Sequence, residues 1–172
     1  MIEKAFKELD QIVPEKINLL IGGGAAILVL DIMPISTYDI DAIPFKSVIG
    51  SEELKPYRET VAKKLNLPLD WINEYFYEFT HCLPSNYGER LHVFFKGEKL
   101  ICYVMHPTDI VIMKLFARRK KDESHLRYLI KNNHANLDII DDHLSMMADK
   151  NHPGAKEAYH YFNQLLDALG MK

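Results

Sequence analysis

Two neighbouring segments decide the fold, and the first reads Leu19-Leu20-Ile21-Gly22-Gly23-Gly24-Ala25-Ala26-Ile27-Leu28-Val29-Leu30. The second follows closely and reads Thr37-Tyr38-Asp39-Ile40-Asp41-Ala42-Ile43. The glycines of the first segment separate two apolar runs, as they would in a tight turn from a buried strand into a helix. Polar and apolar residues alternate in the second segment, which is typical of a strand. We therefore expect a strand, a glycine turn, a short buried helix and a second strand.

The second segment directs two carboxylates towards one place. Side chains alternate faces along a strand, so Asp39 and Asp41 project to the same side, with their Cα atoms roughly 6.5 Å apart. Ile40 points the other way, into a core. Two carboxylates this close repel each other unless a cation lies between them. Because hard divalent cations prefer oxygen ligands, the pair predicts a site for Mg²⁺ or Mn²⁺.

The glycine turn predicts the other half of a site. Backbone N–H groups at the start of a helix attract phosphate, so Gly22, Gly23 and Gly24 are candidates to hold a phosphate group. A phosphate site beside a divalent cation indicates phosphoryl or nucleotidyl transfer. Each feature alone also has a simpler interpretation, either as an ordinary turn or as a solvated strand face. Their order and spacing together favour a catalytic site.

The same order of features resembles the nucleotidyltransferase superfamily typified by DNA polymerase beta. Its signature is a hydrophobic strand, a Gly-Gly or Gly-Ser pair that opens a helix, and Asp-x-Asp on the next strand. A second stretch, Pro107–Asp122, is similar to a lysine-containing helix of AbiEii-type abortive-infection toxins and related bacterial nucleotidyltransferases. The resemblance covers roughly residues 15–130.

The resemblance implies an enzyme that binds an NTP with Mg²⁺ or Mn²⁺ and transfers a nucleotidyl group to an acceptor. The acceptor would be an RNA such as tRNA, a protein or a small molecule, and the context a toxin–antitoxin or phage-defence system with a partner protein. Asp39 and Asp41 would be catalytic and hold the metal, and Lys114 would be catalytic by offsetting phosphate charge. The nucleotide-binding residues would be Gly22, Gly23, Gly24, Thr37 and Arg118.

A third carboxylate is missing from the place where active polymerase-like members carry it. The candidate strand Leu100–Val104 contains no acid, and the nearest acids are Glu98 and Glu89. We expect neither to be essential, because Mg²⁺ accepts water in place of a ligand. The absence also leaves a second hypothesis open, in which a catalytically weak nucleotidyltransferase-like protein acts by binding a partner.

The whole chain predicts an α/β (α+β) fold, a mixed sheet of about four strands with flanking helices and a helical C-terminal extension. Residues 1–122 would form the nucleotidyltransferase-like domain, and residues 123–172 an extension packed on it. We expect strands at 16–21, 37–43, 90–95 and 99–104. We expect helices at 2–12, 24–30, 51–65, 70–79, 108–121, 123–132, 136–149 and 153–169.

Other kinds of site fit the sequence less well. A dinucleotide-binding turn would need glycine or alanine where Ile27 stands. The 8 histidines and 2 cysteines show no zinc-ligand spacing. The basic run Arg119–Lys121 also suits a solvated helix end or a surface that faces RNA.

Net charge, hydropathy and cysteine content limit the partners and the cellular location that we expect. A formal charge of −3 provides no general attraction to nucleic acid or to anionic membranes. The apolar segment Leu19–Ile35 is too short and too rich in glycine to span a membrane. Cys82 and Cys102 fit a reducing compartment better than a disulfide framework. The charged amphipathic N-terminus does not resemble a signal peptide, so we expect a cytoplasmic protein.

Overall fold

A computed structural model describes residues 2–34 and 39–171 of the chain. These residues form two compact units. The first contains the chain up to Tyr77 together with Leu91–Met105, and the second contains Glu78–Arg90 together with the chain from His106 onward. The division expected at residue 122 stays a prediction.

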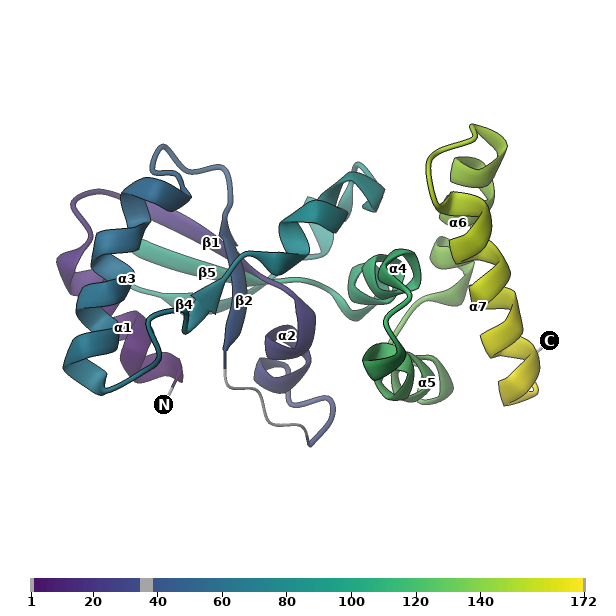
Figure 1. Ribbon diagram of the computed structural model, residues 1–172, viewed down its shortest axis with the longest axis horizontal. Helices are drawn as coiled ribbons and strands as arrows, with labels where there is room; N and C mark the ends of the chain where they lie inside the picture. The colour runs from purple at the N-terminus through teal and green to yellow at the C-terminus, as the bar shows by residue number, and fades with distance from the viewer. Residues whose placement is uncertain (1, 35–38, 172) are drawn as a thin grey trace. The chain divides into compact units, whose positions relative to one another are not determined.

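The first unit is built on a sheet in the order β3-β2-β1-β5-β4 (Figure 1). Its strands are β1 (Ile17–Ile21), β2 (Ile40–Pro44), β3 (Ile72–Asn73), β4 (His92–Lys96) and β5 (Leu100–Val104). Strand β1 is antiparallel to β2 and parallel to β5, while β3 is parallel to β2 and β4 is antiparallel to β5. The predicted mixed sheet with flanking helices is confirmed, with one short strand added.

The register of the sheet decides which segments meet at each end. Ile21, the last residue of β1, pairs with Ala42 near the start of β2 and with Val104 at the end of β5. The central strand β1 is buried from Leu19 to Ile21, because the sheet is covered on both faces there. The turn after β1 therefore lies beside the beginning of β2, where the two acids are.

Three helices complete the first unit: α1 (Ile2–Ile12), α2 (Gly23–Val29) and α3 (Ser51–Leu65). The apolar face of α1 buries Phe6, whose ring centroid lies 6.0 Å from those of Trp71 and Phe95. Helices α1 and α3 lie side by side (Figure 1). The three helices occur where the sequence predicts them, because their hydrophobic patterns and end signals are local.

The predicted helix at 70–79 is wrong. Strand β3 (Ile72–Asn73) occupies its start, and the 3₁₀-helix η1 (Tyr75–Cys82) follows. The Trp71 carbonyl accepts the Ile40 N–H at 2.8 Å, and the Trp71 ring N–H donates to the Arg58 carbonyl at 2.9 Å. These contacts with β2 and α3 hold the segment extended, so tertiary pairing overrides the helical spacing of its aromatic residues.

The second unit is helical and surrounds one buried helix. Its elements after η1 are η2 (Tyr87–Arg90), α4 (Pro107–Ala117), η3 (Lys120–Asp122), α5 (Glu123–Lys131), α6 (Leu137–Asp149) and α7 (Ala155–Leu169). Every residue of α4 from Pro107 to Phe116 is buried, and α5, α6 and α7 all contact this helix. An all-round apolar helix of this kind forms the centre of its unit. None of the helices in the described chain has the length and apolar character to cross a bilayer.

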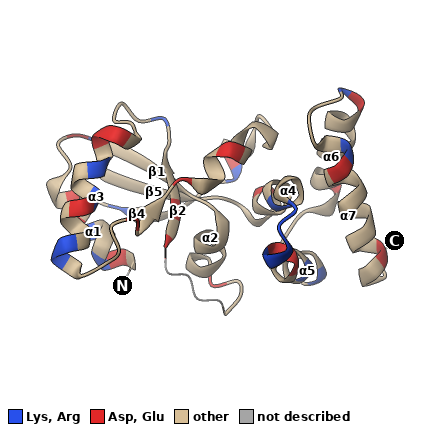
Figure 2. Ribbon diagram, viewed as in Figure 1, with Lys and Arg blue, Asp and Glu red and all other residues tan. Residues whose placement is uncertain are grey.

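Helix α4 is shorter than the sequence predicts, since it ends at Ala117 rather than near residue 121. Arg118 adopts the left-handed conformation with φ 49°, and its N–H donates to the Lys114 carbonyl. This is a common way to end a helix, although glycine is the usual residue there. The basic run then leaves the helix as the blue stretch that leads from α4 towards α5 (Figure 2). This turn allows Asp122 of η3 to reach the side chain of Lys114 in α4.

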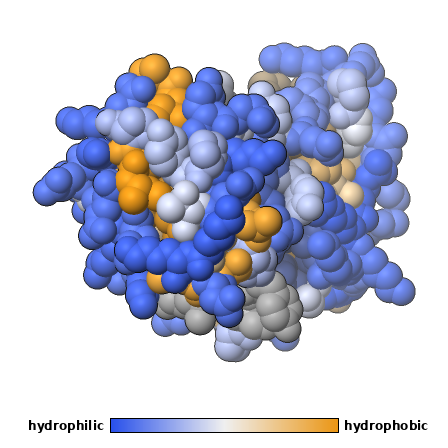
Figure 3. All heavy atoms as spheres, turned by 60° about the vertical axis from the view of Figure 1, so that its left-hand side comes forward, coloured by the Kyte–Doolittle hydropathy of each residue, from blue (hydrophilic) through white to orange (hydrophobic). Residues whose placement is uncertain are grey.

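The surface carries no single large apolar area on the face shown in Figure 3, where apolar side chains form several separate groups among hydrophilic ones. Among the exposed large apolar residues are Val48, Leu69 and Val93. Scattered apolar side chains are normal on globular proteins. They do not by themselves mark a binding surface.

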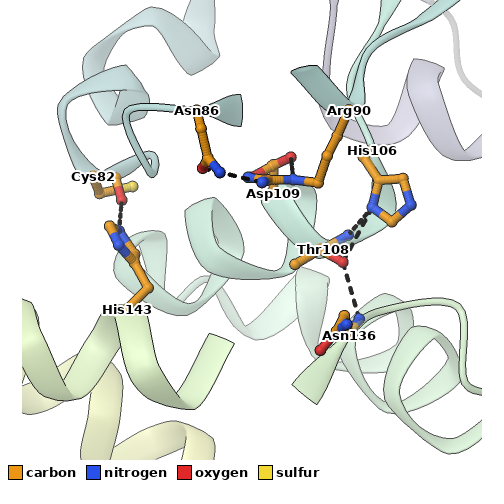
Figure 4. A network of polar contacts seen from close by, with 8 residues as sticks. All are labelled: Cys82, Asn86, Arg90, His106, Thr108, Asp109, Asn136 and His143. Carbon is orange, nitrogen blue, oxygen red and sulfur yellow. Dashed lines mark hydrogen bonds and ion pairs between the residues drawn. The ribbon is translucent and has the colours of Figure 1, made fainter. Parts of the chain in front are cut away.

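A polar network around the buried Asp109 connects η2 to α4 inside the second unit (Figure 4). The Arg90 guanidinium donates to both carboxylate oxygens of Asp109, at 3.0 and 2.6 Å, and to the side chain of Asn86 at 3.1 Å. The Asp109 side chain is completely buried. A two-fold contact with guanidinium is the geometry that best compensates a buried carboxylate, so this pair has a structural role.

Helix α4 begins at Pro107, one residue before the expected start at residue 108. The capping residue is His106, whose Nδ1 accepts the Thr108 N–H at 3.2 Å. The Thr108 hydroxyl instead accepts the Asn136 N–H at 2.9 Å, just before α6 (Figure 4). Proline at position 107 suits the first turn of a helix, where its missing N–H is not needed.

Candidate functional site

The glycine turn after β1 lies directly against the start of β2. The Gly22 N–H donates to the Asp41 carbonyl at 2.9 Å. Gly22 is buried beneath the ring of Phe76, which would be 3.1 Å from a Cβ atom at this position. The turn is therefore held from two sides, by β2 and by the beginning of η1.

Gly23 opens α2 and supports the side chain of Asp41. Its φ is +56°, a left-handed conformation that favours glycine. A Cβ atom at Gly23 would overlap the Oδ2 atom of Asp41. The Asp41 carboxylate therefore lies against the Cα atom of Gly23, which no other residue type permits.

The two acids alternate with a buried residue, as predicted. Ile40 is 5% exposed, whereas Asp39 and Asp41 are partly exposed. The Asp39 Oδ2 atom accepts a hydrogen bond from the Asn73 side-chain amide at 2.7 Å. Asn73 is the partner of Asp41 in the pairing of β2 with β3. The structure thus brings Gly22, Gly23, Asp39, Asp41 and Asn73 together at one end of the sheet, and we call these five residues the acid–glycine cluster.

The donor set of the acid–glycine cluster fits a hard divalent cation that is shared with a ligand. In the described part of the chain, no group of three or more His, Cys, Asp or Glu side chains could enclose a metal ion. Mg²⁺ does not need such an enclosure, since it keeps several waters and uses one or two carboxylates together with substrate phosphates. Asp39 and Asp41 supply that number of carboxylates.

Of the two third-acid candidates, Glu98 does not join this cluster. The Glu98 N–H donates to Asp10 at 3.1 Å, in the turn that precedes Leu100. That turn lies at the Ile17 end of β1, because Ile17 pairs with Leu100. The acid–glycine cluster lies at the Ile21 end, about 13 Å away along the strand. Glu89 lies in η2 of the second unit.

Lys114 belongs to the second unit, where it forms a buried ion pair with Asp122. Only 8% of the surface of Lys114 is exposed. In a continuous helix two residues eight apart would be about 12 Å apart, so the early end of α4 makes this contact possible. His125 Nδ1 is 3.9 Å from Asp122 Oδ1 and has no hydrogen-bond partner among the described residues. Burial and the nearby Lys114 lower the pKa of His125.

The remaining predicted nucleotide-binding residues are Thr37 and Arg118. Thr37 lies outside the described residues. Arg118 lines an open depression of about 670 Å³ in the second unit. Lys120 and Lys156 also line it, as do the acids Glu123 and Glu157. The depression therefore has mixed charge.

The sequence did not predict that Asn73 belongs to the candidate site. The helical spacing of Trp71, Tyr75 and Phe79 placed it in a helix, where it carried no chemical signal. Its side chain meets Asp39 only because β3 pairs with β2. A two-residue strand leaves too short a pattern to recognise from sequence.

Comparison with known proteins gives one result. Residues 1–167 match the family described as "Nucleotidyltransferase of unknown function (DUF6036)". No curated protein and no solved structure matches the chain. The family match covers segments of both units and agrees with the resemblance of the glycine turn and the Asp-x-Asp strand to nucleotidyltransferases. The chain belongs to this family of nucleotidyltransferases of unknown function.

Proposed function

We propose that the protein transfers a nucleotidyl group from an NTP to an acceptor at the acid–glycine cluster, with Mg²⁺ or Mn²⁺ as cofactor. One observation carries the proposal: the Asp41 carboxylate lies against Gly23, so the glycine turn and the acid pair form one site. Membership of a nucleotidyltransferase family supports the reaction type. The remaining steps follow from the chemistry of these side chains.

Asp39 and Asp41 would hold the metal, and the turn Gly22–Gly24 would let the nucleotide phosphates approach the backbone closely. The metal would neutralise the leaving pyrophosphate, and if two ions bind, one of them would lower the pKa of the acceptor hydroxyl. For that reason a dedicated general base is not required. The family resemblance also predicts phosphate contacts for Lys114, Arg118 and Thr37, and these three stay predictions.

The acceptor would be an RNA such as tRNA, a protein or a small molecule. The similarity of Pro107–Asp122 to AbiEii-type toxins favours a role in a toxin–antitoxin or phage-defence system. The two free, buried cysteines suit the reducing cytoplasm of a cell. A neighbouring gene for a small helical partner would support this context.

A second candidate function is a catalytically weak module that binds a partner protein. The observation that favours it is the position of Glu98 at the opposite end of the sheet from Asp39 and Asp41. In this case the acid–glycine cluster would still bind an NTP but would not transfer its nucleotidyl group to an acceptor.

Thermal unfolding with each of the four NTPs and Mg²⁺ or Mn²⁺ tests nucleotide binding. A ligand that binds only the folded state stabilises it by about 2.7 kcal/mol at 100 times its Kd. We expect one NTP at least to raise the unfolding temperature, and Asp39→Asn and Asp41→Asn to remove that response while the protein still folds. Glu98→Gln is the matched control and should respond like the wild type. No response to any NTP at millimolar concentration would refute the proposal.

Incubation with the labelled NTP that binds and with cell extract tests transfer. Label in an RNA, protein or small-molecule fraction identifies the acceptor class and supports the enzyme. Binding without any transfer favours the partner-binding module. Lys114 is not a suitable first variant, because removing one partner of a buried ion pair destabilises the fold by itself.

A further inference from the structure

Asn73 is a buried polar residue in the acid–glycine cluster, with 7% of its surface exposed. Both ends of its side-chain amide make hydrogen bonds. The Nδ2 atom donates to Asp39 Oδ2 at 2.7 Å, and the Oδ1 atom accepts the Tyr75 N–H at 3.1 Å. A buried amide that satisfies both ends has one defined orientation.

These partners determine the direction of the amide without ambiguity. A backbone N–H can only donate, so the oxygen of Asn73 must face Tyr75. The NH₂ group must then face Asp39, where an ionised carboxylate accepts it. Asn73 is therefore arranged to hold the Asp39 side chain in one rotamer.

The contact with Tyr75 also shapes the chain around the glycine turn. An asparagine that accepts the N–H two residues later forms an Asx turn, which changes the direction of the chain. Here the Asx turn of Asn73 leads from β3 into η1 and places Phe76 against Gly22. One side chain thus connects the acid to the packing of the glycine turn.

We propose that Asn73 is a positioning residue of the nucleotidyl-transfer site, which orients Asp39 towards the metal. The inference rests on the proposed function and adds to it a residue that does not itself bind the metal. Hydrogen bonds of this kind orient metal ligands in many proteins, and their loss typically costs 10–100-fold, roughly, in metal affinity. We expect an effect near the lower end of that range, since the site is partly exposed.

Asn73→Ser separates the two contacts of the side chain. A serine hydroxyl can accept the N–H two residues later and keep the turn, but it is too short to reach Asp39. Asn73→Thr provides the same test with a residue that favours strands, should the serine variant not fold. The matched control is Glu74→Gln, which weakens the neighbouring contact of Glu74 with Arg58 at 3.3 Å and leaves Asp39 untouched.

Titration of the full chain with Mn²⁺ alone, followed by electron paramagnetic resonance, measures metal affinity without activity. We expect Asn73→Ser to weaken Mn²⁺ binding on the order of 10-fold, with an unfolding temperature close to that of the wild type. Glu74→Gln should bind Mn²⁺ like the wild type, and Asp39→Asn should lose binding. Equal Mn²⁺ affinity in Asn73→Ser and wild type would overturn the inference, as would an equal loss in Glu74→Gln. Absence of Mn²⁺ binding in the wild type, both alone and with each of the four NTPs present, would instead overturn the proposed function, and the inference with it.

Discussion

Gly23 shows how one residue can be required for two independent reasons. Its backbone has a φ of +56°, and the Asp41 carboxylate occupies the space where a side chain would begin. The first reason concerns the free energy of folding. The second concerns the position of a proposed metal ligand, so the two can be measured separately.

Gly23→Ala should destabilise the protein and abolish its response to nucleotide. The left-handed backbone costs a non-glycine residue about 1–2 kcal/mol, and the new methyl group must displace Asp41. Urea unfolding measures the first effect, and thermal shift with NTP and Mg²⁺ measures the second. Gly170→Ala is the control, because Gly170 has a φ of +66° but no atom within 4 Å of the added Cβ. A normal nucleotide response in Gly23→Ala would show that Asp41 need not stay where it is.

At the scale of elements, the β4–β5 hairpin is fastened to α1 by Asp10. The Asp10 carboxylate accepts the backbone N–H groups of Glu98, Lys99 and Leu100 at 3.1, 2.8 and 2.7 Å. Burial alone would raise the pKa of Asp10, but these N–H donors outweigh burial and hold the pKa below its ordinary value of 3.8. The charged form of Asp10 therefore stabilises the folded state.

Asp10→Asn should lower the free energy of unfolding at neutral pH by about 1 kcal/mol, because a neutral amide accepts hydrogen bonds more weakly than a carboxylate. The folded-state pKa is depressed, so this stabilisation is complete above the unfolded-state pKa and disappears as the pH falls through the folded-state value. The difference between the two proteins should thus narrow below about pH 4. Urea unfolding of both proteins at pH 7 and pH 3 measures this difference in the free energy of unfolding. A difference that stays constant with pH would contradict the assignment.

At the scale of the whole molecule, each unit contains one cysteine. Cys82 lies in the second unit and Cys102 in β5 of the first, and both are buried and free. Burial raises the pKa of the Cys82 thiol to about 12, and it also raises the pKa of Cys102. Because the thiolate is the reactive form, both residues should be inert until their unit opens.

A thiol-specific reagent should consequently leave the native protein unlabelled at neutral pH and label it fully in denaturant. The single variants Cys82→Ala and Cys102→Ala let each remaining thiol report on its own unit. NTP with Mg²⁺ should slow the labelling of Cys102, since the proposed site belongs to the same unit. The labelling rate of Cys82 under the same conditions measures whether the two units unfold together. Rapid labelling of Cys102 in the native protein would contradict its burial.

The sequence by itself determined the segments whose patterns are local. The β1–turn–α2–β2 order, the buried Ile40 between two partly exposed acids and the strands β4 and β5 were predicted, although β2 begins at Ile40, after Asp39. Each depends on neighbours within a few residues, through strand alternation, helix periodicity or the conformational freedom of glycine. The nucleotidyltransferase resemblance rests on these same segments, and the family match agrees with it.

Only the tertiary structure decided the contacts between distant segments. A strand as short as β3 exists through its pairing with β2, and Asn73 meets Asp39 for that reason alone. Strand direction places Glu98 at the end of the sheet away from the acids, and the early end of α4 pairs Lys114 with Asp122. Such contacts depend on which surfaces the chain buries together, and the free energy of that burial is shared by residues far apart in sequence.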